Sequence, residues 1–265
     1  MQTGIFSKTE VLALVERCTE LLKTRFGAQR VISFGSLVGK GVWHPRSDLD
    51  LAVEGLPPEQ FFRAWSSLQE VLPQGLTVDL VPLEDVYPEM RARILEEEDM
   101  PTDPILALKG LVDDELIALQ RVVEEAQEGM SHVADPPSQF EMNALASYVH
   151  QFYTGCERVF ERIVVYIDKE APGGAFSHAN LLVQMARERP GVRPPVLDEG
   201  LWLHLQDYLE FRHFFRHAYG YALDWAKLRP LVEGMSNTLA DFRRQLTMLF
   251  TALATSREEA DGKHT

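Results

Sequence analysis

The segment VISFGSLVGKGVWHPRSDLDLAV, residues 31–53, decides the fold of the first part of the chain. It begins with an apolar, β-branched run and turns at Gly35 and Ser36. A glycine-containing loop follows, and the chain then returns in a run where Asp48 and Asp50 alternate with leucines. Because alternate side chains of a strand share a face, we expect the two aspartates to point the same way and the leucines to enter a core. The segment therefore predicts two strands joined by a loop.

A third aspartate, Asp79, lies in a short apolar run at residues 77–81, TVDLV. Its apolar neighbours would share one face of a strand, and Asp79 would lie on the other. Close carboxylates repel each other unless a cation lies between them, and Mg²⁺ prefers oxygen ligands. An isolated D-x-D is common at a solvated strand end. Three acids from two strands beside a Gly-Ser turn instead indicate a site for a metal-bound triphosphate, and therefore nucleotidyl transfer.

These motifs, read as GS, SDLDL and VDLV in chain order, resemble those of the minimal nucleotidyltransferases, small members of the polymerase-β-like superfamily. The resemblance covers about residues 29–100 and implies ATP as substrate with Mg²⁺ or Mn²⁺ as cofactor. The resemblance implies that the nucleotide phosphates are bound by Gly35, Ser36 and Lys40. Lys40 replaces an arginine that the family often has in this loop. The residues that it implies as metal ligands and catalytic groups are Asp48, Asp50 and Asp79. Asp79 would also deprotonate the acceptor hydroxyl.

Composition limits the classes of function that remain. The chain has 265 residues and a formal net charge of −14, which argues against a general nucleic-acid binder and against DNA as a partner. No apolar run approaches the roughly 20 residues of a membrane-spanning helix. Cys18 and Cys156 are isolated cysteines on apolar helix faces, which predicts buried thiols. Without a disulfide framework or an export signal pattern, a cytoplasmic protein is expected.

Hydrophobic periodicity predicts an α+β chain with two domains. Residues 1–103 would form a small mixed sheet with helices, residues 104–256 an all-helical bundle, and residues 257–265 a disordered tail. The expected strands of the first domain cover residues 30–36, 48–54 and 76–82, and its expected helices cover residues 8–26, 57–72 and 86–98. The expected helices of the second domain cover residues 105–128, 139–170, 177–189, 198–220 and 225–255.

The densest positive cluster of this acidic chain lies in the segment FRHFFRHAYGY, residues 211–221. At 100° per residue on a helix, Arg212, Arg216 and Tyr219 would share one face. A helix flank that packs its aromatic residues and solvates its basic ends would have the same composition. Without a known family, the cluster leaves a structural and a functional interpretation open.

The order Arg212-x₄-His217-x-Tyr219 resembles the R-x₄-H-x-Y motif of HEPN domains, specifically the HepT-like toxins. The resemblance implies that Arg212 and His217 cleave RNA, with transfer RNA as a candidate, in a homodimer formed through the helical domain. An imidazole that titrates near neutral pH suits proton transfer, and a guanidinium suits a phosphate. This chain has His213 where many HEPN proteins have asparagine.

The two resemblances together are typical of a toxin–antitoxin pair, here fused in one chain. In that family the nucleotidyltransferase silences the ribonuclease by transferring AMP to the tyrosine of the motif, which is Tyr219. An alternative is a nucleotidyltransferase that modifies a small molecule such as an aminoglycoside-type antibiotic, with the helical domain helping to hold the substrate. A third possibility is a scaffold that holds nucleotide without turnover.

Overall fold

The computed structural model describes residues 8–34, 49–73, 76–86, 91, 94–95, 103–169, 177–217 and 223–262, without the side chains of residues 8, 177–179, 217 and 257–262. The chain separates into two compact units, Met1–Ala107 and Leu108–Thr265. The division falls inside the first long helix of the second half. In the described residues, strands of a sheet occur only in the first unit, so the chain has the α+β composition that its periodicity predicts.

The first unit contains a three-stranded mixed sheet in the order β1-β2-β3. Strand β1 (Arg30–Ser33) pairs antiparallel with β2 (Leu49–Glu54), and β2 pairs parallel with β3 (Val78–Pro82). The parallel pair needs a crossover connection, which the short 3-10 helix η2 (Pro58–Gln60) and helix α2 (Phe61–Val71) provide. This is the strand, strand, helix, strand order that the sequence predicts.

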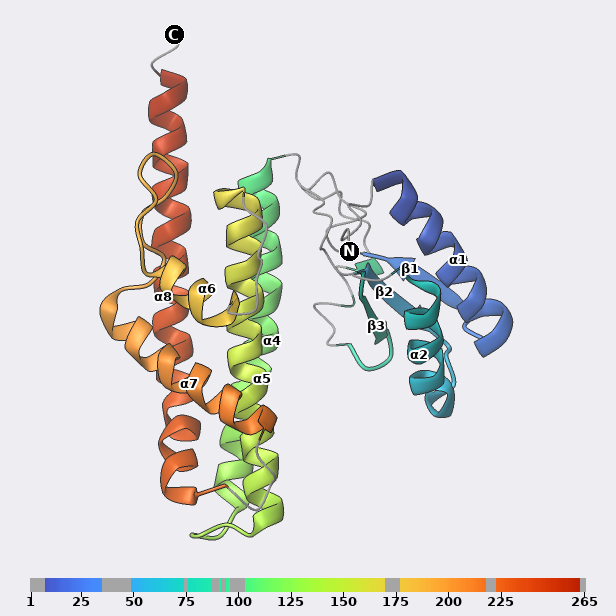
Figure 1. Ribbon diagram of the computed structural model, residues 1–265, viewed down its shortest axis with the longest axis horizontal. Helices are drawn as coiled ribbons and strands as arrows, with labels where there is room; N and C mark the ends of the chain where they lie inside the picture. Colours follow the sequence, from blue (N-terminus) through green and yellow to red (C-terminus); the bar gives the residue numbers. More distant parts are fainter. Residues whose placement is uncertain are drawn as a thin grey trace. The chain divides into compact units, whose positions relative to one another are not determined.

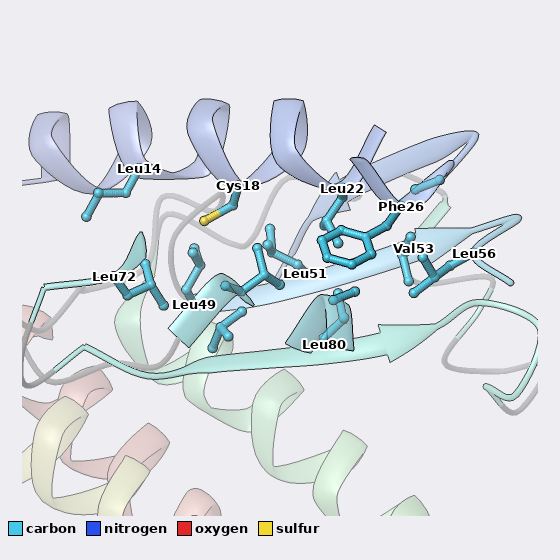
Figure 2. Close-up of a cluster of buried hydrophobic side chains, with 14 of the residues drawn as sticks. Leu14, Cys18, Leu22, Phe26, Leu49, Leu51, Val53, Leu56, Leu72 and Leu80 are labelled. Carbon is cyan, nitrogen blue, oxygen red and sulfur yellow. The ribbon is translucent and has the colours of Figure 1, made fainter. Parts of the chain in front are cut away.

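The core of this unit lies between the sheet and its helices, because alternate strand residues point to the same side. Helix α1 (Lys8–Phe26) faces the sheet with Leu14, Cys18, Leu22 and Phe26, as Figure 2 shows. From β2 and β3 the buried residues of this face are Leu49, Leu51, Val53, Val78 and Leu80. The opposite face has a smaller cluster around Ala52, Leu83 and Ile94. Both aspartates of the described strands alternate with these core residues.

The second unit consists of helices in the described residues (Figure 1). Helix α5 packs against α6, α7 and α8, and α7 also packs against α8. The bounds are α4 (Pro104–His132), α5 (Gln139–Ile163), α6 (Ser177–Met185), α7 (Glu199–His217) and α8 (Trp225–Gly262). Helix α5 begins at a capping box, in which the Ser138 side chain accepts from the Glu141 N–H and Glu141 accepts from the Ser138 N–H.

Several helix ends differ from the sequence-based expectation. Helix α4 ends at His132 and α6 at Met185, whereas their ends were expected at residues 128 and 189. The helix expected over residues 139–170 is α-helical only to Ile163 and continues as a π-helical segment, η3 (Val164–Asp168), before Lys169 takes a left-handed conformation with φ of 56°. Helix α8 extends to Gly262, although a disordered tail was expected from residue 257. Arginine, glutamate and alanine between residues 257 and 260 favour helix, which accounts for the extension. The domain limits themselves stay a prediction.

Helices α4 and α5 approach each other closely at Gly155. A Cβ atom at this position would lie 2.6 Å from Cδ2 of Leu119 and 3.1 Å from Oε1 of Glu115, so any larger residue would have to displace the Leu119 side chain. The contact is reinforced by Arg162, whose guanidinium donates to the Leu111 carbonyl at 2.5 Å and lies 3.3 Å from Glu115. The lack of a side chain at position 155 therefore makes room for Leu119 and Glu115 of α4 against α5.

We expect Gly155→Ala to lower the stability of the helical unit by about 1–3 kcal/mol, because the added methyl group overpacks a buried contact. Gly129→Ala, on α4, is the matched control, since its Cβ would meet Leu145 at an ordinary 3.4 Å. The control should gain up to about 1 kcal/mol from helix propensity. Urea unfolding followed by circular dichroism measures both, and shifts of the same sign would contradict the close approach.

Candidate functional site

The first candidate site lies on the sheet face opposite the main core. Asp50 of β2 and Asp79 of β3 are direct register partners of the parallel pair. Partners in neighbouring strands point to the same face and lie about 5 Å apart at their Cα atoms. Asp79 is exposed and Asp50 is half-buried. The structure therefore brings two of the three predicted acids together, from strands that are 29 residues apart at these positions.

The chain enters and leaves the glycine-containing loop beside Asp50. The N–H of Phe34, the last described residue before the loop, donates to the Asp50 carbonyl at 3.1 Å. Leu49, the first described residue after it, donates to the Thr77 carbonyl at 2.8 Å. The loop residues predicted to bind nucleotide or metal, Gly35, Ser36, Lys40 and Asp48, lie outside the described residues. Their placement stays a prediction.

The acid pair has the chemistry that a divalent cation requires. Two adjacent carboxylates supply oxygen ligands and carry negative charge that a cation offsets. Within the described ranges no three His, Cys, Asp or Glu side chains gather as a metal-binding group, and Asp48, the predicted third member, is not among those residues. The observed pair fits a divalent cation as part of a ligand set.

The second candidate site lies between α5 and α7 and contains Arg212. This side chain is buried, although the sequence places it in a basic cluster that could equally be solvated. Its Nη2 atom lies 3.0 Å from Oε2 of Glu157 on α5, and only 9% and 5% of the two side chains are exposed. Burial raises the pKa of Glu157 to about 7, and the positive charge of Arg212 opposes this rise. Glu157 and Arg212 therefore form an ion pair that is buried on both sides of the contact.

Two further polar residues of α5 lie near the same arginine. His150 and Tyr153 precede Glu157 by seven and four residues, a spacing that places all three on one helix face. The His150 ring lies 5.5 Å from the ring of Phe215 on α7. Burial lowers the pKa of His150, and Arg212 and Arg216 lower it further. His150 is therefore a neutral imidazole at pH 7.

Replacing Arg216 by alanine should raise the pKa of His150, because the variant removes one of the two positive charges that oppose protonation of the ring. Arg216 is exposed, so its loss should leave the helix packing intact. NMR titration of the histidine ring signals, with His150→Gln for assignment, measures the change. Arg244→Ala is the control, because Arg244 is an exposed arginine of α8, and it should leave the pKa of His150 unchanged. A His150 pKa that falls or stays constant in Arg216→Ala would contradict the interaction.

The remaining residues of the predicted second motif are described in part. His217 is the last residue of α7, but its side chain is outside the described part, and Tyr219 lies in the segment that follows. His213 is exposed. The structure thus shows where Arg212 lies, while the joint geometry of Arg212, His217 and Tyr219 stays a prediction.

Sequence reasoning missed Glu157, His150 and Tyr153 as members of this site. Their only signal was polar residues at helical spacing on a face that is otherwise apolar, where Val149, Phe152 and Cys156 are fully buried. Glu157 and Arg212 are 55 residues apart in the chain. Their contact depends on how α5 and α7 pack, which periodicity does not specify. The two thiols, in contrast, are free and buried as predicted.

Comparison with known families matches each half of the chain to a different domain. Residues 15–98 match a family model described as a nucleotidyltransferase domain. Residues 144–253 match one described as a HepT-like protein. No curated protein and no solved structure gave a match. The first range contains the sheet with Asp50 and Asp79, and the second contains the helices that hold Glu157 and Arg212.

A small mixed sheet with paired acids, followed by a separate helical unit, defines a nucleotidyltransferase-type domain joined to a helical partner. The chain is a fusion of a nucleotidyltransferase domain and a HepT-like domain of the HEPN class, as its motifs predicted. No helix among the described residues is long and apolar enough to cross a membrane.

Proposed function

We propose that this chain is a self-contained toxin–antitoxin, in which the nucleotidyltransferase domain transfers AMP from ATP to Tyr219 of the HepT-like domain and thereby silences a ribonuclease. The observation that carries the proposal is the direct register of Asp50 and Asp79 in a domain that matches nucleotidyltransferases. The match of the second half to HepT-like proteins supports the identity of the acceptor domain.

In the transfer step, the Tyr219 oxygen attacks the α-phosphorus of ATP. A P–O bond forms to the tyrosine while the bond between the α- and β-phosphates breaks, and pyrophosphate leaves. Asp79 accepts the phenolic proton, and its exposure on the sheet face leaves it open to an acceptor. Asp48, Asp50 and Asp79 would hold the divalent cation, while Gly35, Ser36 and Lys40 would bind the phosphates. A bound Mg²⁺ or Mn²⁺ ion would neutralise negative charge on the α-phosphate.

The unmodified HepT-like domain cleaves RNA through Arg212 and His217. His217 transfers protons, and Arg212 offsets the negative charge of the phosphate. Five residues of α-helix separate the two positions by about 140° around the helix, which favours a composite site across a homodimer of the helical domain. An AMP group on Tyr219 is a bulky anion that would pair with nearby arginines and obstruct the phosphate position.

Growth of cells that express the full chain tests both roles at once. Asp50→Asn/Asp79→Asn should arrest growth, because the ribonuclease is then never silenced. Adding Arg212→Ala to the same protein should restore growth. Equal growth of the two strains, with both proteins present at similar levels on an immunoblot, would contradict the proposal and favour a small-molecule acceptor or a scaffold.

A further inference from the structure

The buried contact between α5 and α7 leaves the bonding capacity of Arg212 incomplete. Of its three guanidinium nitrogens, Nη2 meets Glu157 at 3.0 Å. Neither Nε nor Nη1 has a hydrogen-bond partner among the residues that the structure describes, although both are buried. Buried donors are normally satisfied, because an unsatisfied one keeps an uncompensated cost of desolvation. The arginine is therefore held by one acid while it retains donors for a further acceptor.

Glu157 is the acid that is placed to determine where this guanidinium lies. The ion pair connects two packed helices, because Glu157 lies on α5 and Arg212 on α7. Glu157 therefore fixes the guanidinium of Arg212 relative to α5. Among the described residues, other titratable groups interact with Glu157, Arg212 or the adjoining Cys156. They include His150, Tyr153 and Glu161 of α5, Tyr208 and Arg216 of α7, and Glu115 of α4. Within the described residues, Glu157 is the acid paired with Arg212.

A carboxylate in this position has two opposing effects on an arginine that must bind phosphate. It orients the guanidinium, which favours reaction of a correctly placed phosphate. It also competes with the phosphate, because both anions are attracted by the same positive charge, and this competition is strong where water is excluded. Removing the carboxylate should therefore strengthen phosphate binding and weaken turnover. A residue with a purely structural role would not separate these two quantities.

We propose that Glu157 is the positioning residue of Arg212 in the HepT-like domain, holding the guanidinium between α5 and α7 and competing with the RNA phosphate for it. The proposal rests on the proposed function in one respect, namely that Arg212 acts on RNA. The part that concerns the placement of Arg212 stands on the ion pair itself.

The test uses the full chain with Asp79→Asn as parent, made by cell-free synthesis so that toxicity does not select against it. The variants in this parent are Glu157→Gln, Glu157→Asp, Arg212→Ala and Glu115→Gln. Glu115→Gln is the matched control, because Glu115 is also a buried acid between helices but faces Arg158 and Arg162 at 3.7 and 3.3 Å. Circular dichroism first establishes that each variant is folded at the assay temperature.

The first readout is cleavage of purified bulk transfer RNA over a range of concentrations. For Glu157→Gln we expect kcat to fall about tenfold or more and KM to fall about threefold or more. Glu157→Asp retains the charge and should recover most of kcat, while Glu115→Gln should leave both constants near those of the parent. The proposal would be overturned if Arg212→Ala abolishes cleavage by the parent while Glu157→Gln leaves both kcat and KM unchanged.

The second readout does not depend on RNA cleavage. Phenylglyoxal modifies a buried arginine only when its guanidinium becomes transiently accessible, and mass spectrometry of the Arg212 peptide gives its rate of modification. Glu157→Gln should raise this rate about threefold or more, because the guanidinium is no longer held in an ion pair. Glu115→Gln should not change it. Inorganic phosphate should slow the modification more in Glu157→Gln than in the parent.

The two readouts separate a failure of this proposal from a failure of the proposed function. If the parent does not cleave RNA, or cleaves it equally well with Arg212→Ala, the proposed ribonuclease role is wrong and positioning for RNA cleavage is wrong with it. In that case a faster modification of Arg212 in Glu157→Gln still supports the placement of Arg212 by Glu157. An unchanged rate of modification in Glu157→Gln would overturn that placement as well.

Discussion

Asp79→Asn is expected to reduce the rate of AMP transfer from ATP by at least about a hundredfold. Loss of one group that stabilises a transition state typically lowers the rate by this much. Asp79 is exposed beside Asp50 on the sheet face, and it is assigned both to metal binding and to accepting the proton of the acceptor. Asparagine keeps the shape of the side chain but supplies neither the negative charge nor the basic oxygen. The loss should therefore appear mainly in kcat.

The measurement is release of pyrophosphate from ATP by the full chain in the presence of Mg²⁺. Asp85→Asn is the matched control, because it removes the same charge from an exposed position just after β3 without lying in the acid pair. The control should retain nearly all of the activity. Equal activity of Asp79→Asn and Asp85→Asn would show that Asp79 takes no part in the transfer.

Asp168→Asn is expected to lower the stability of the helical unit by about 3–5 kcal/mol, the usual cost of breaking a buried ion pair on one side. Asp168 and Arg193 have no exposed side-chain surface and meet at 2.8 Å and 3.0 Å through two hydrogen bonds. Gln184 donates to the same carboxylate at 2.9 Å, and Arg189 lies 3.3 Å away. Asparagine would leave the buried charge of Arg193 uncompensated.

The Asp168 carboxylate links the connection between α6 and α7 to η3, the segment that follows α5. Arg193 also donates to the carbonyls of Arg187, Pro194 and Gln184, so its position determines the path of that connection. Asp113→Asn is the control, since Asp113 pairs with Lys109 on the exposed surface of α4 and should contribute about 0.5 kcal/mol or less. Urea unfolding followed by circular dichroism gives the free energy of unfolding of Asp168→Asn and Asp113→Asn. A loss of similar size in both variants would contradict the structural role of Asp168.

The sequence was sufficient to predict features that depend on local periodicity. Alternation alone places Leu49, Leu51 and Val53 in the core and Asp50 on the other face, because successive strand residues point to opposite sides. Helix α1 was predicted over the residues that it occupies. In both cases the pattern and the structure depend on the same short stretch of chain.

Contacts between segments that are far apart in the sequence could not be predicted from local periodicity. The register of β2 against β3, which pairs Asp50 with Asp79, depends on how α2 packs on the sheet. The ion pair of Glu157 with Arg212 likewise depends on long-range helix packing. A continuing apolar period also predicted helix through residue 170, whereas the backbone changes to a π-helix at Val164. Periodicity indicates which face is buried but does not specify hydrogen-bond spacing or partner helices.

Mass spectrometry of the Tyr219 peptide tests the central claim most directly. The full chain is first freed of any AMP that it already carries and is then incubated with ATP and Mg²⁺. The account predicts a peptide heavier by one or more AMP groups, with fragmentation that locates the first group on Tyr219 and with no such increase in Asp79→Asn. An unmodified Tyr219 peptide from a protein that consumes ATP normally would contradict it.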